Sequence, residues 1–325
     1  MERDYRLDLL RVFAISLVVL MHSPRPDSVS GFLLSGISYF TAPGLVLFFM
    51  ISGALLLDNN LSTKDFLKRR FSKIVFPTLF WTFFYLSVKY LGNLKPLPDI
   101  CKSIISIPFS AQGHGVLWFM YTLAGLYLLA PILSRWLKTA SKREIEFYLL
   151  LWGVTLVFPY LSMWLQINES KEGLLYYFTG YLGYFVLGHY LIHYYCYRLW
   201  HIIIAIGIVI IVPLVLYSSG IDFDFYTALW YLSLPVALMA FVIFVMVERL
   251  SNHKIPLISM ISKLSFGIYF VHIFIMRNII WNLDAVTQLP GNIQIPVIAF
   301  VTFVMSLLFS WIVSKLSFSK YIIGC

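Results

Sequence analysis

Residues 7–22 read LDLLRVFAISLVVLMH, an apolar stretch that contains Arg11 and ends at His22. At about 100° per residue, eleven steps return to within roughly 20° of the start, so these two side chains share one helical face. They lie about 16 Å apart along the axis, near half the thickness of the hydrocarbon core. An arginine at that depth needs an anionic partner or a wet cavity. The stretch therefore predicts a polar site inside a membrane.

The composition of the whole chain is that of an integral membrane protein. Of its 325 residues, 60% are hydrophobic and only 12% are charged. Several segments exceed about 18 residues with almost no charge, which is the length of a transmembrane helix. We predict an all-α polytopic membrane protein with a single membrane-embedded domain over residues 1–325 and no cleavable signal peptide. Cys101, Cys196 and Cys325 show no metal or redox spacing.

Hydropathy predicts about ten transmembrane helices, and the basic residues predict their orientation. The spans are roughly 7–25, 40–57, 74–92, 116–137, 145–165, 174–195, 199–217, 228–248, 262–283 and 294–316. With the amino terminus in the cytoplasm, 17 of the 24 basic residues fall on cytoplasmic segments, six on the opposite side, and Arg11 lies within the bilayer. Both termini are then cytoplasmic. An alternative count follows if segment 26–42 forms a re-entrant or interfacial piece of the membrane domain.

The most basic predicted cytoplasmic connection runs from Lys64 to Lys73. Its apolar residues recur at helical spacing, which predicts a short amphipathic helix at the inner interface. The simplest role for its basic residues is to mark the cytoplasmic side and to contact anionic membrane lipids. The net charge of +9 is dispersed between the spans, which does not fit a nucleic-acid partner.

An ordered set of motifs resembles the acyltransferase-3 family of integral membrane acyltransferases. The set comprises Arg11 with His22, LFFMISG at 47–53, Arg69-Arg70 ahead of Pro77, LWF at 117–119 and LSFGIYFVH at 264–272. Each motif alone is weak, but together they occur in the family's order over nearly the whole chain. The compact form is similar to the enterobacterial common antigen O-acetyltransferase type.

The resemblance implies an activity and its partners. A membrane-bound O-acyltransferase of this family would transfer an acyl group, acetyl above all, from cytoplasmic acyl-coenzyme A (acyl-CoA) to a hydroxyl of a lipid-linked or cell-surface carbohydrate. Its location would be the bacterial inner (plasma) membrane, in contact with membrane lipids. Acetyl-CoA would be a substrate, and neither a permanently bound cofactor nor a metal is expected.

The first motif supplies the two residues that we expect to be catalytic. His22 lies at the far boundary of the membrane, and a histidine is suited to accept a proton from a sugar hydroxyl near neutral pH. Arg11 stays protonated, so its role is electrostatic: it can hold a phosphate or polarise a carbonyl. An alternative for Arg11 is a structural ion pair with Asp8 or with Glu248.

The remaining motifs supply candidate binding residues. The resemblance implies donor binding by Arg69, Arg70, Lys73 and Ser52. Two pairs that each share a helical face are candidates for acceptor binding: His114 with Trp118, four residues apart, and Tyr269 with His272, three residues apart. Interfacial anchoring explains Trp118 equally well, and His272 can instead bridge two helices. The Ser52-Gly53 pair is more typical of close helix packing than of a nucleophile, which favours direct transfer.

A transporter is the main alternative function. Arg11 would then be the counter-charge for a small anion or amino acid. Transporters commonly contain paired broken helices in duplicated halves. Pro43 and Pro77 interrupt the second and third spans, but no corresponding pattern recurs in spans seven and eight.

Overall fold

A computed structural model describes residues 4–91, 101–102, 104–106, 115–167, 172–220 and 229–325, and in these residues every regular element is a helix. The α-helices are α1 (Tyr5–His22), α2 (Gly31–Thr41), α3 (Pro43–Leu56), α4 (Thr63–Phe66), α5 (Ser72–Leu91), α7 (Trp118–Thr139), α8 (Lys142–Thr155), α9 (Phe158–Leu165), α10 (Leu182–His193), α11 (Leu199–Ser218), α13 (Leu234–Glu248), α14 (Pro256–Asn278), α15 (Asp284–Thr287), α16 (Gly291–Val313) and α17 (Ser319–Ile322). A π-helical turn, η2 (Leu67–Phe71), joins α4 to α5, and short 3₁₀ turns are η1 (Pro26–Ser28), η3 (Gly115–Leu117), η4 (Tyr176–Phe178) and η5 (Ile280–Asn282).

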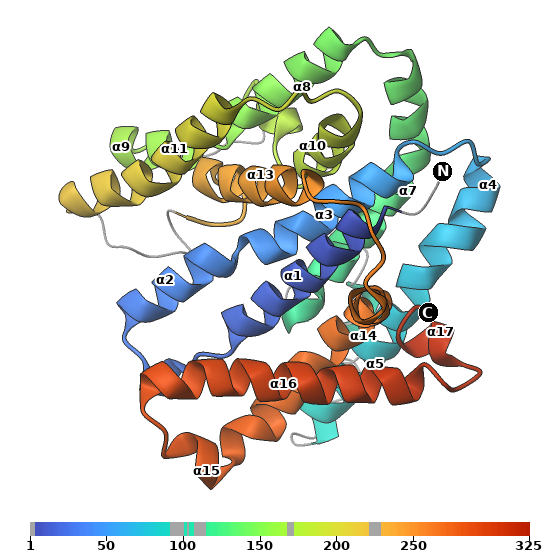
Figure 1. Cartoon of the computed structure of the whole chain (residues 1–325), viewed down its shortest axis with the longest axis vertical. Helices are drawn as coiled ribbons and strands as arrows, with labels where there is room; N and C mark the ends of the chain where they lie inside the picture. Colours follow the sequence, from blue (N-terminus) through green and yellow to red (C-terminus); the bar gives the residue numbers. More distant parts are fainter. Residues whose placement is uncertain (1–3, 92–100, 103, 107–114, 168–171, 221–228) are drawn as a thin grey trace.

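Helix α3 is the centre of the bundle. It begins at Pro43, whose missing N–H is not needed at the first position of a helix. All of its residues except Leu55 are buried. A helix that is apolar and buried on all sides belongs in the interior of a membrane bundle. Figure 1 shows α1 beside α3, with α14 and α16 on the other side of α1.

Glycines let the backbones of the central helices approach closely. An added Cβ at Gly53 of α3 would overlap the carbonyl of Phe185 in α10, and one at Gly188 of α10 would overlap the carbonyl of Met50. Gly44 likewise packs against the backbone of Ala14 in α1. Close packing through small residues is how membrane helices associate without a hydrophobic driving force between them. The packing role expected for the Ser52-Gly53 pair is therefore confirmed at Gly53.

Six helical stretches among the described residues are long and apolar enough to cross a membrane. They are Gly31–Leu56, Thr63–Lys89, Lys142–Leu165, Leu199–Ser218, Pro256–Asn282 and Gly291–Val313. The first is mostly buried, whereas α11 has only Ile202, Ala205 and Leu216 buried and exposes many of its other apolar side chains. An all-helical multi-pass bundle is confirmed, and the count of ten spans stays a prediction.

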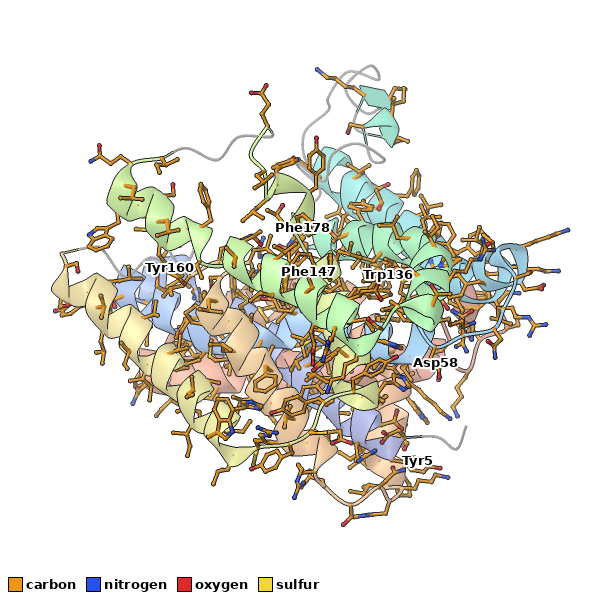
Figure 2. The ribbon with its side chains drawn as sticks, turned by 90° about the horizontal axis from the view of Figure 1, so that it is seen from above. Tyr5, Asp58, Trp136, Phe147, Tyr160 and Phe178 are labelled. Atoms are coloured by element: carbon orange, nitrogen blue, oxygen red, sulfur yellow. The ribbon has the colours of Figure 1, made fainter. Side chains whose placement is uncertain are left out.

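The two termini lie at the same end of the bundle. Figure 1 places the N and C labels and α4 on one side, and α2, α9 and α15 on the other. Figure 2, turned by 90°, places Tyr5 and Asp58 on the first side and Tyr160 on the second. We call the side of the termini the basic end and the side where α1 ends at His22 the far end. This arrangement agrees with two termini on one side of the membrane, and the cytoplasmic assignment stays a prediction.

Two predicted boundaries at the start of the chain are wrong. Residues 31–41 are not a separate interfacial piece, because α2 runs into α3 at Pro43 and the two form one apolar stretch, Gly31–Leu56. The basic segment is not an independent amphipathic helix either. It continues through η2 into α5, and Phe66 is fully buried against the core, with its ring centroid 6.3 Å from that of Tyr127.

Later in the chain, several predicted spans are shorter or interrupted. The span expected at 174–195 contains α10, whose 12 residues rise only about 18 Å. The span expected at 145–165 divides into α8 and α9, and the span at 228–248 begins as α13 only at Leu234. Hydropathy responds to apolar residues in turns as well as in helices, so it extends such spans too far.

The close packing of α3 on α10 predicts that one methyl group added at Gly53 destabilises the protein. Gly53→Ala should lower the thermal unfolding temperature of the detergent-purified protein, because overpacking against a backbone costs about 1–3 kcal/mol or more. Gly207→Ala in α11 is the matched control, since nothing lies within 4 Å of its added Cβ. Equal unfolding temperatures for the two variants would contradict the packing.

The native cysteines allow a direct test of the predicted orientation of the protein in the membrane, because Cys101, Cys196 and Cys325 are all exposed. In variants that keep one cysteine each, a membrane-impermeant maleimide added to intact cells should label Cys101 but neither Cys196 nor Cys325. All three should react after the cells are lysed. Labelling of Cys325 in intact cells would place the basic end outside and overturn the orientation.

Candidate functional site

A pocket with many basic side chains opens at the basic end of the bundle. It has a volume of about 730 Å³. Its lining comes from η2 and the start of α5, from the loop after α3, and from α17, and includes Asp58, Asn59, Lys68, Arg69, Arg70, Ser72, Lys73, Lys320 and Tyr321. The three basic residues of η2 are exposed, and all three line this opening. We call this the basic pocket.

A second, smaller cavity adjoins the basic pocket and reaches into the bundle. Its volume is about 200 Å³, and it shares Leu55, Arg70 and Lys73 with the basic pocket. Deeper in, its lining includes Arg11 of α1, Ser52 of α3, Tyr127 of α7 and, from α14, Ser262, Lys263, Ser265 and Phe266. We call this the arginine cavity. It supplies the polar surroundings that a guanidinium at this depth requires.

Small hydroxyl side chains create the space around Arg11. Ser52 and Ser265 are both buried and line the cavity. Their side chains are small, so they leave space that a larger apolar side chain would fill. The Tyr127 hydroxyl interacts with Ser52 and is within electrostatic range of Arg11 and Arg70. The cavity thus combines fixed positive charge with hydroxyl groups that can donate or accept hydrogen bonds.

A buried carboxylate lies one helical turn before Arg11. Asp8 accepts hydrogen bonds from the hydroxyls of Ser259 at 3.0 Å and Ser262 at 2.8 Å, both on α14. These bonds fix the start of α14 beside the start of α1. Glu248, the other carboxylate considered as a partner of Arg11, pairs with Arg6 at 3.0 Å.

At the far end of the same two helices, two histidines meet. The His22 ring is 5.3 Å from that of His272, at an angle of 67°. His22 Nδ1 lies 2.8 Å from the Val18 carbonyl, and His272 Nδ1 lies 2.5 Å from the Tyr269 carbonyl. A carbonyl only accepts, so each Nδ1 carries the hydrogen and each neutral ring keeps a lone pair on Nε2. His272 is fully buried, and its Nε2 has no hydrogen-bond partner among the described residues, whereas His22 is partly exposed.

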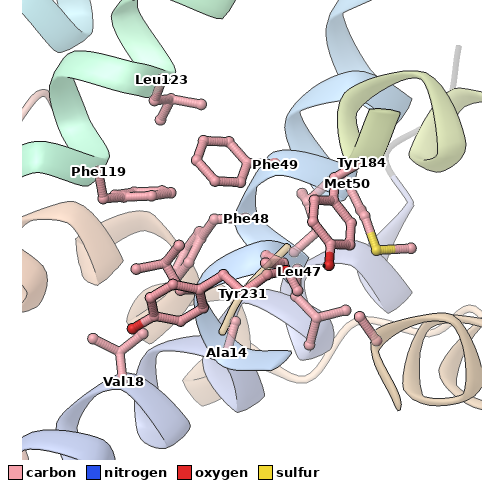
Figure 3. Packing of buried hydrophobic residues seen from close by; sticks show 14 of the residues in the cluster. Ala14, Val18, Leu47, Phe48, Phe49, Met50, Phe119, Leu123, Tyr184 and Tyr231 are labelled. Carbon is pink, nitrogen blue, oxygen red and sulfur yellow. Dashed lines mark hydrogen bonds between the residues drawn. The ribbon is translucent and has the colours of Figure 1, made fainter. Parts of the chain in front are cut away.

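Aromatic contacts connect the arginine cavity to the two histidines, beginning at Phe266 of the cavity lining, whose ring is 6.2 Å from that of Phe48. The Phe119 ring contacts Phe49 at 4.8 Å and Tyr269 at 5.3 Å, and Phe48 contacts Phe119 at 5.9 Å. Figure 3 shows Phe48, Phe49 and Phe119 gathered between α3 and α7, with Ala14 and Val18 of α1 below them. Tyr269 connects this cluster to the far end, since its ring is 5.7 Å from His272.

The structure brings the predicted residues together in two groups along α1. Arg11, Ser52, Arg70 and Lys73 line the arginine cavity, and His22, Tyr269 and His272 lie at the far end. Arg69 lines only the basic pocket. His114 lies outside the described residues.

Trp118 lies in an aromatic group near the far end. Its ring contacts Tyr181, Trp230 and Tyr231 at centroid distances of 5.5, 6.4 and 5.5 Å. The Tyr231 hydroxyl reaches the sulfur of Met21 at 3.1 Å, next to His22. Trp118 is therefore part of the aromatic packing beside the far end.

The sequence reasoning missed three kinds of residue in the site. Tyr127 gives no signal within an apolar helix, and Lys263 was counted only as a marker of the cytoplasmic side. Ser262 and Ser265 could have been found, because with Tyr269 and His272 they recur every three or four residues along one face of α14.

A family model described as an acyltransferase domain, Acyl_transf_3, matches residues 4–315 of the chain. Among the curated proteins and the solved structures compared with the chain, none matches. The matched range contains both groups of residues described above.

Proposed function

Because this chain belongs to the acyltransferase-3 family, we propose that it transfers an acyl group, acetyl in the simplest case, from acyl-CoA to a hydroxyl of a lipid-linked or cell-surface carbohydrate at the bacterial inner membrane. One observation carries the proposal. The basic pocket continues into the arginine cavity, and the two share Arg70 and Lys73. A polyanionic head with a long thin arm, which is the shape of a coenzyme A thioester, fits a wide basic opening that narrows inward.

The donor binds with its phosphates at the basic pocket. Arg69 and Arg70 offer planar forks that can hold phosphate oxygens through paired hydrogen bonds, and Lys73 adds a point charge. The pantetheine arm enters the arginine cavity beside Ser52. There, the Arg11 cation stabilises negative charge on the donor. Because Arg11 lies inside the bundle, a donor held there has its acyl group directed toward the far end of α1.

At the far end, His22 acts as the general base. With hydrogen on Nδ1, its Nε2 lone pair accepts the proton of the acceptor hydroxyl. The hydroxyl oxygen forms a bond to the thioester carbon, the carbon–sulfur bond breaks, and the proton passes to the sulfur of coenzyme A. Transfer is direct, so Ser52 acts as a donor-binding residue. Proximity of the two substrates within one bundle adds to the effect of the base.

The donor site predicts different effects for two neighbouring arginines, because Arg70 lines both cavities and Arg69 lines only the basic pocket. Arg70→Gln should weaken acetyl-CoA binding roughly 10- to 100-fold, the size of a lost hydrogen bond to a charged group, and Arg69→Gln should weaken it less. Arg70→Lys should restore part of the binding. Calorimetry on protein in nanodiscs measures all three dissociation constants.

Arg135→Gln is the matched control for this series. Arg135 lies at the same end and bonds the Thr63 hydroxyl at 3.0 Å, but it lines neither cavity. Its variant should bind acetyl-CoA like the wild type. Equal acetyl-CoA binding by the Arg70 and Arg135 variants would contradict a role for Arg70 in donor binding. The basic residues of the pocket would then only mark the cytoplasmic side of the membrane.

The mechanism predicts that His22→Ala separates binding from transfer. The variant should bind acetyl-CoA normally and lose about 10²- to 10⁴-fold in acetyl transfer, the usual contribution of a general base. The measurement is incorporation of labelled acetyl into acceptor by membranes that contain each variant. His193→Ala, at an exposed histidine of α10, is the control. Wild-type transfer by the His22 variant would exclude His22 as the base.

A further inference from the structure

An arginine at the far end of α14 has no role in the mechanism above. Arg277 lies in the last turn of α14 and is exposed. Its guanidinium lies 5.7 Å from the centre of the Trp281 ring, and its carbonyl accepts a hydrogen bond from the Asn282 side chain at 3.1 Å. The side chain is therefore held at the end of the bundle where His22 and His272 meet.

The charges around Arg277 are unbalanced. It follows His272 by five residues on α14, about 7.5 Å along the helix axis, and its charge acts on both His22 and His272. No carboxylate of the described residues lies within 4 Å of its guanidinium, whereas Arg6 at the basic end has two such partners, Asp4 and Glu248. Among the described residues, the far end therefore presents a cation near the proposed base with no carboxylate in contact with it.

A structural role explains part of this placement. A cation in the last turn of a helix interacts favourably with the helix dipole, by about 0.3–1 kcal/mol, and stacking on an aromatic ring adds a similar amount. Arg249 shows the same combination: it caps α13 and lies 4.4 Å from the centre of the Tyr197 ring. What distinguishes Arg277 is its nearness to the two histidines, which neither effect requires.

We propose that Arg277 binds an anionic group of the acceptor, a phosphate or a carboxylate, so that the protein selects an acidic or phosphate-linked carbohydrate. The inference rests on the proposed function and names its substrate class. An exposed guanidinium can hold either anion through two parallel hydrogen bonds. The bound anion places the neighbouring hydroxyl beside His22.

The proposed reaction gives this anion a second effect. When His22 accepts the hydroxyl proton it becomes a cation, and Arg277 is a second cation nearby. Two like charges near a protein surface repel each other more than they would in bulk water. An anion bound at Arg277 offsets that repulsion only while the acceptor is in place. Arg277 thus links recognition of the acceptor to proton transfer at His22.

The test uses membrane vesicles that contain the full chain and the host's own acceptors, supplied with acetyl-labelled acetyl-CoA. Arg277→Gln should incorporate label about 10- to 100-fold more slowly than wild type at limiting acceptor, with unchanged acetyl-CoA binding, and Arg277→Lys should keep part of the rate. Arg249→Gln, which loses the same charge and ring contact elsewhere, should behave like wild type. The labelled wild-type product should bind to an anion-exchange column.

The outcomes separate the proposal from the function on which it rests. Loss of product charge after mild acid would identify a phosphate-linked carrier as the anion, and retained charge would identify an acidic sugar. An uncharged product, or equal rates for Arg277→Gln and Arg249→Gln, would overturn the role of Arg277 alone. No incorporation by the wild type would instead contradict acyl transfer itself, and the acceptor proposal with it.

Discussion

A guanidinium group within an apolar helix of a membrane bundle must be surrounded by polar groups, and this bundle meets that requirement at Arg11. Placing an unpartnered charge in hydrocarbon costs at least a few kcal/mol. The helices around Arg11 supply serine and tyrosine hydroxyls, and the small side chains leave a cavity of about 200 Å³. The same cavity opens to the basic pocket through Arg70 and Lys73. The polar surroundings that Arg11 requires thereby also form a cavity in which an anion can bind.

Two parallel helices set the distance over which the site extends. Asp8 bonds two serines at the start of α14, and His22 meets His272 near its end, so α1 and α14 run side by side in the same direction. These contacts fix the register of the two helices. Arg11 and His22 therefore remain about 16 Å apart along one face. Ring contacts through Phe48, Phe119 and Tyr269 connect the two polar regions.

The sequence was sufficient to predict the class of fold and much of the candidate site, for a physical reason. Charged and polar side chains are rare in membrane helices, so each one is informative, and Arg11, Ser52, Arg70 and Lys73 do line one cavity. Tyr127 was missed because an aromatic residue is ordinary in such a helix. The sequence did not reveal that the basic segment continues through η2 into α5, because a hydrophobic pattern does not indicate a π-helical turn. The extent of α10 depends on packing against α3, which periodicity does not contain.

The central claim is that donor and acceptor reach the bundle from opposite ends. Proteoliposomes with a single orientation, established by labelling of Cys325, test it most directly. Acetyl-CoA is supplied on one side only, and acceptor on the other. We predict acetylated acceptor when acetyl-CoA is on the side of the basic end, and none when the two substrates are exchanged. Equal product from both arrangements would contradict a one-way path from Arg70 through Arg11 to His22.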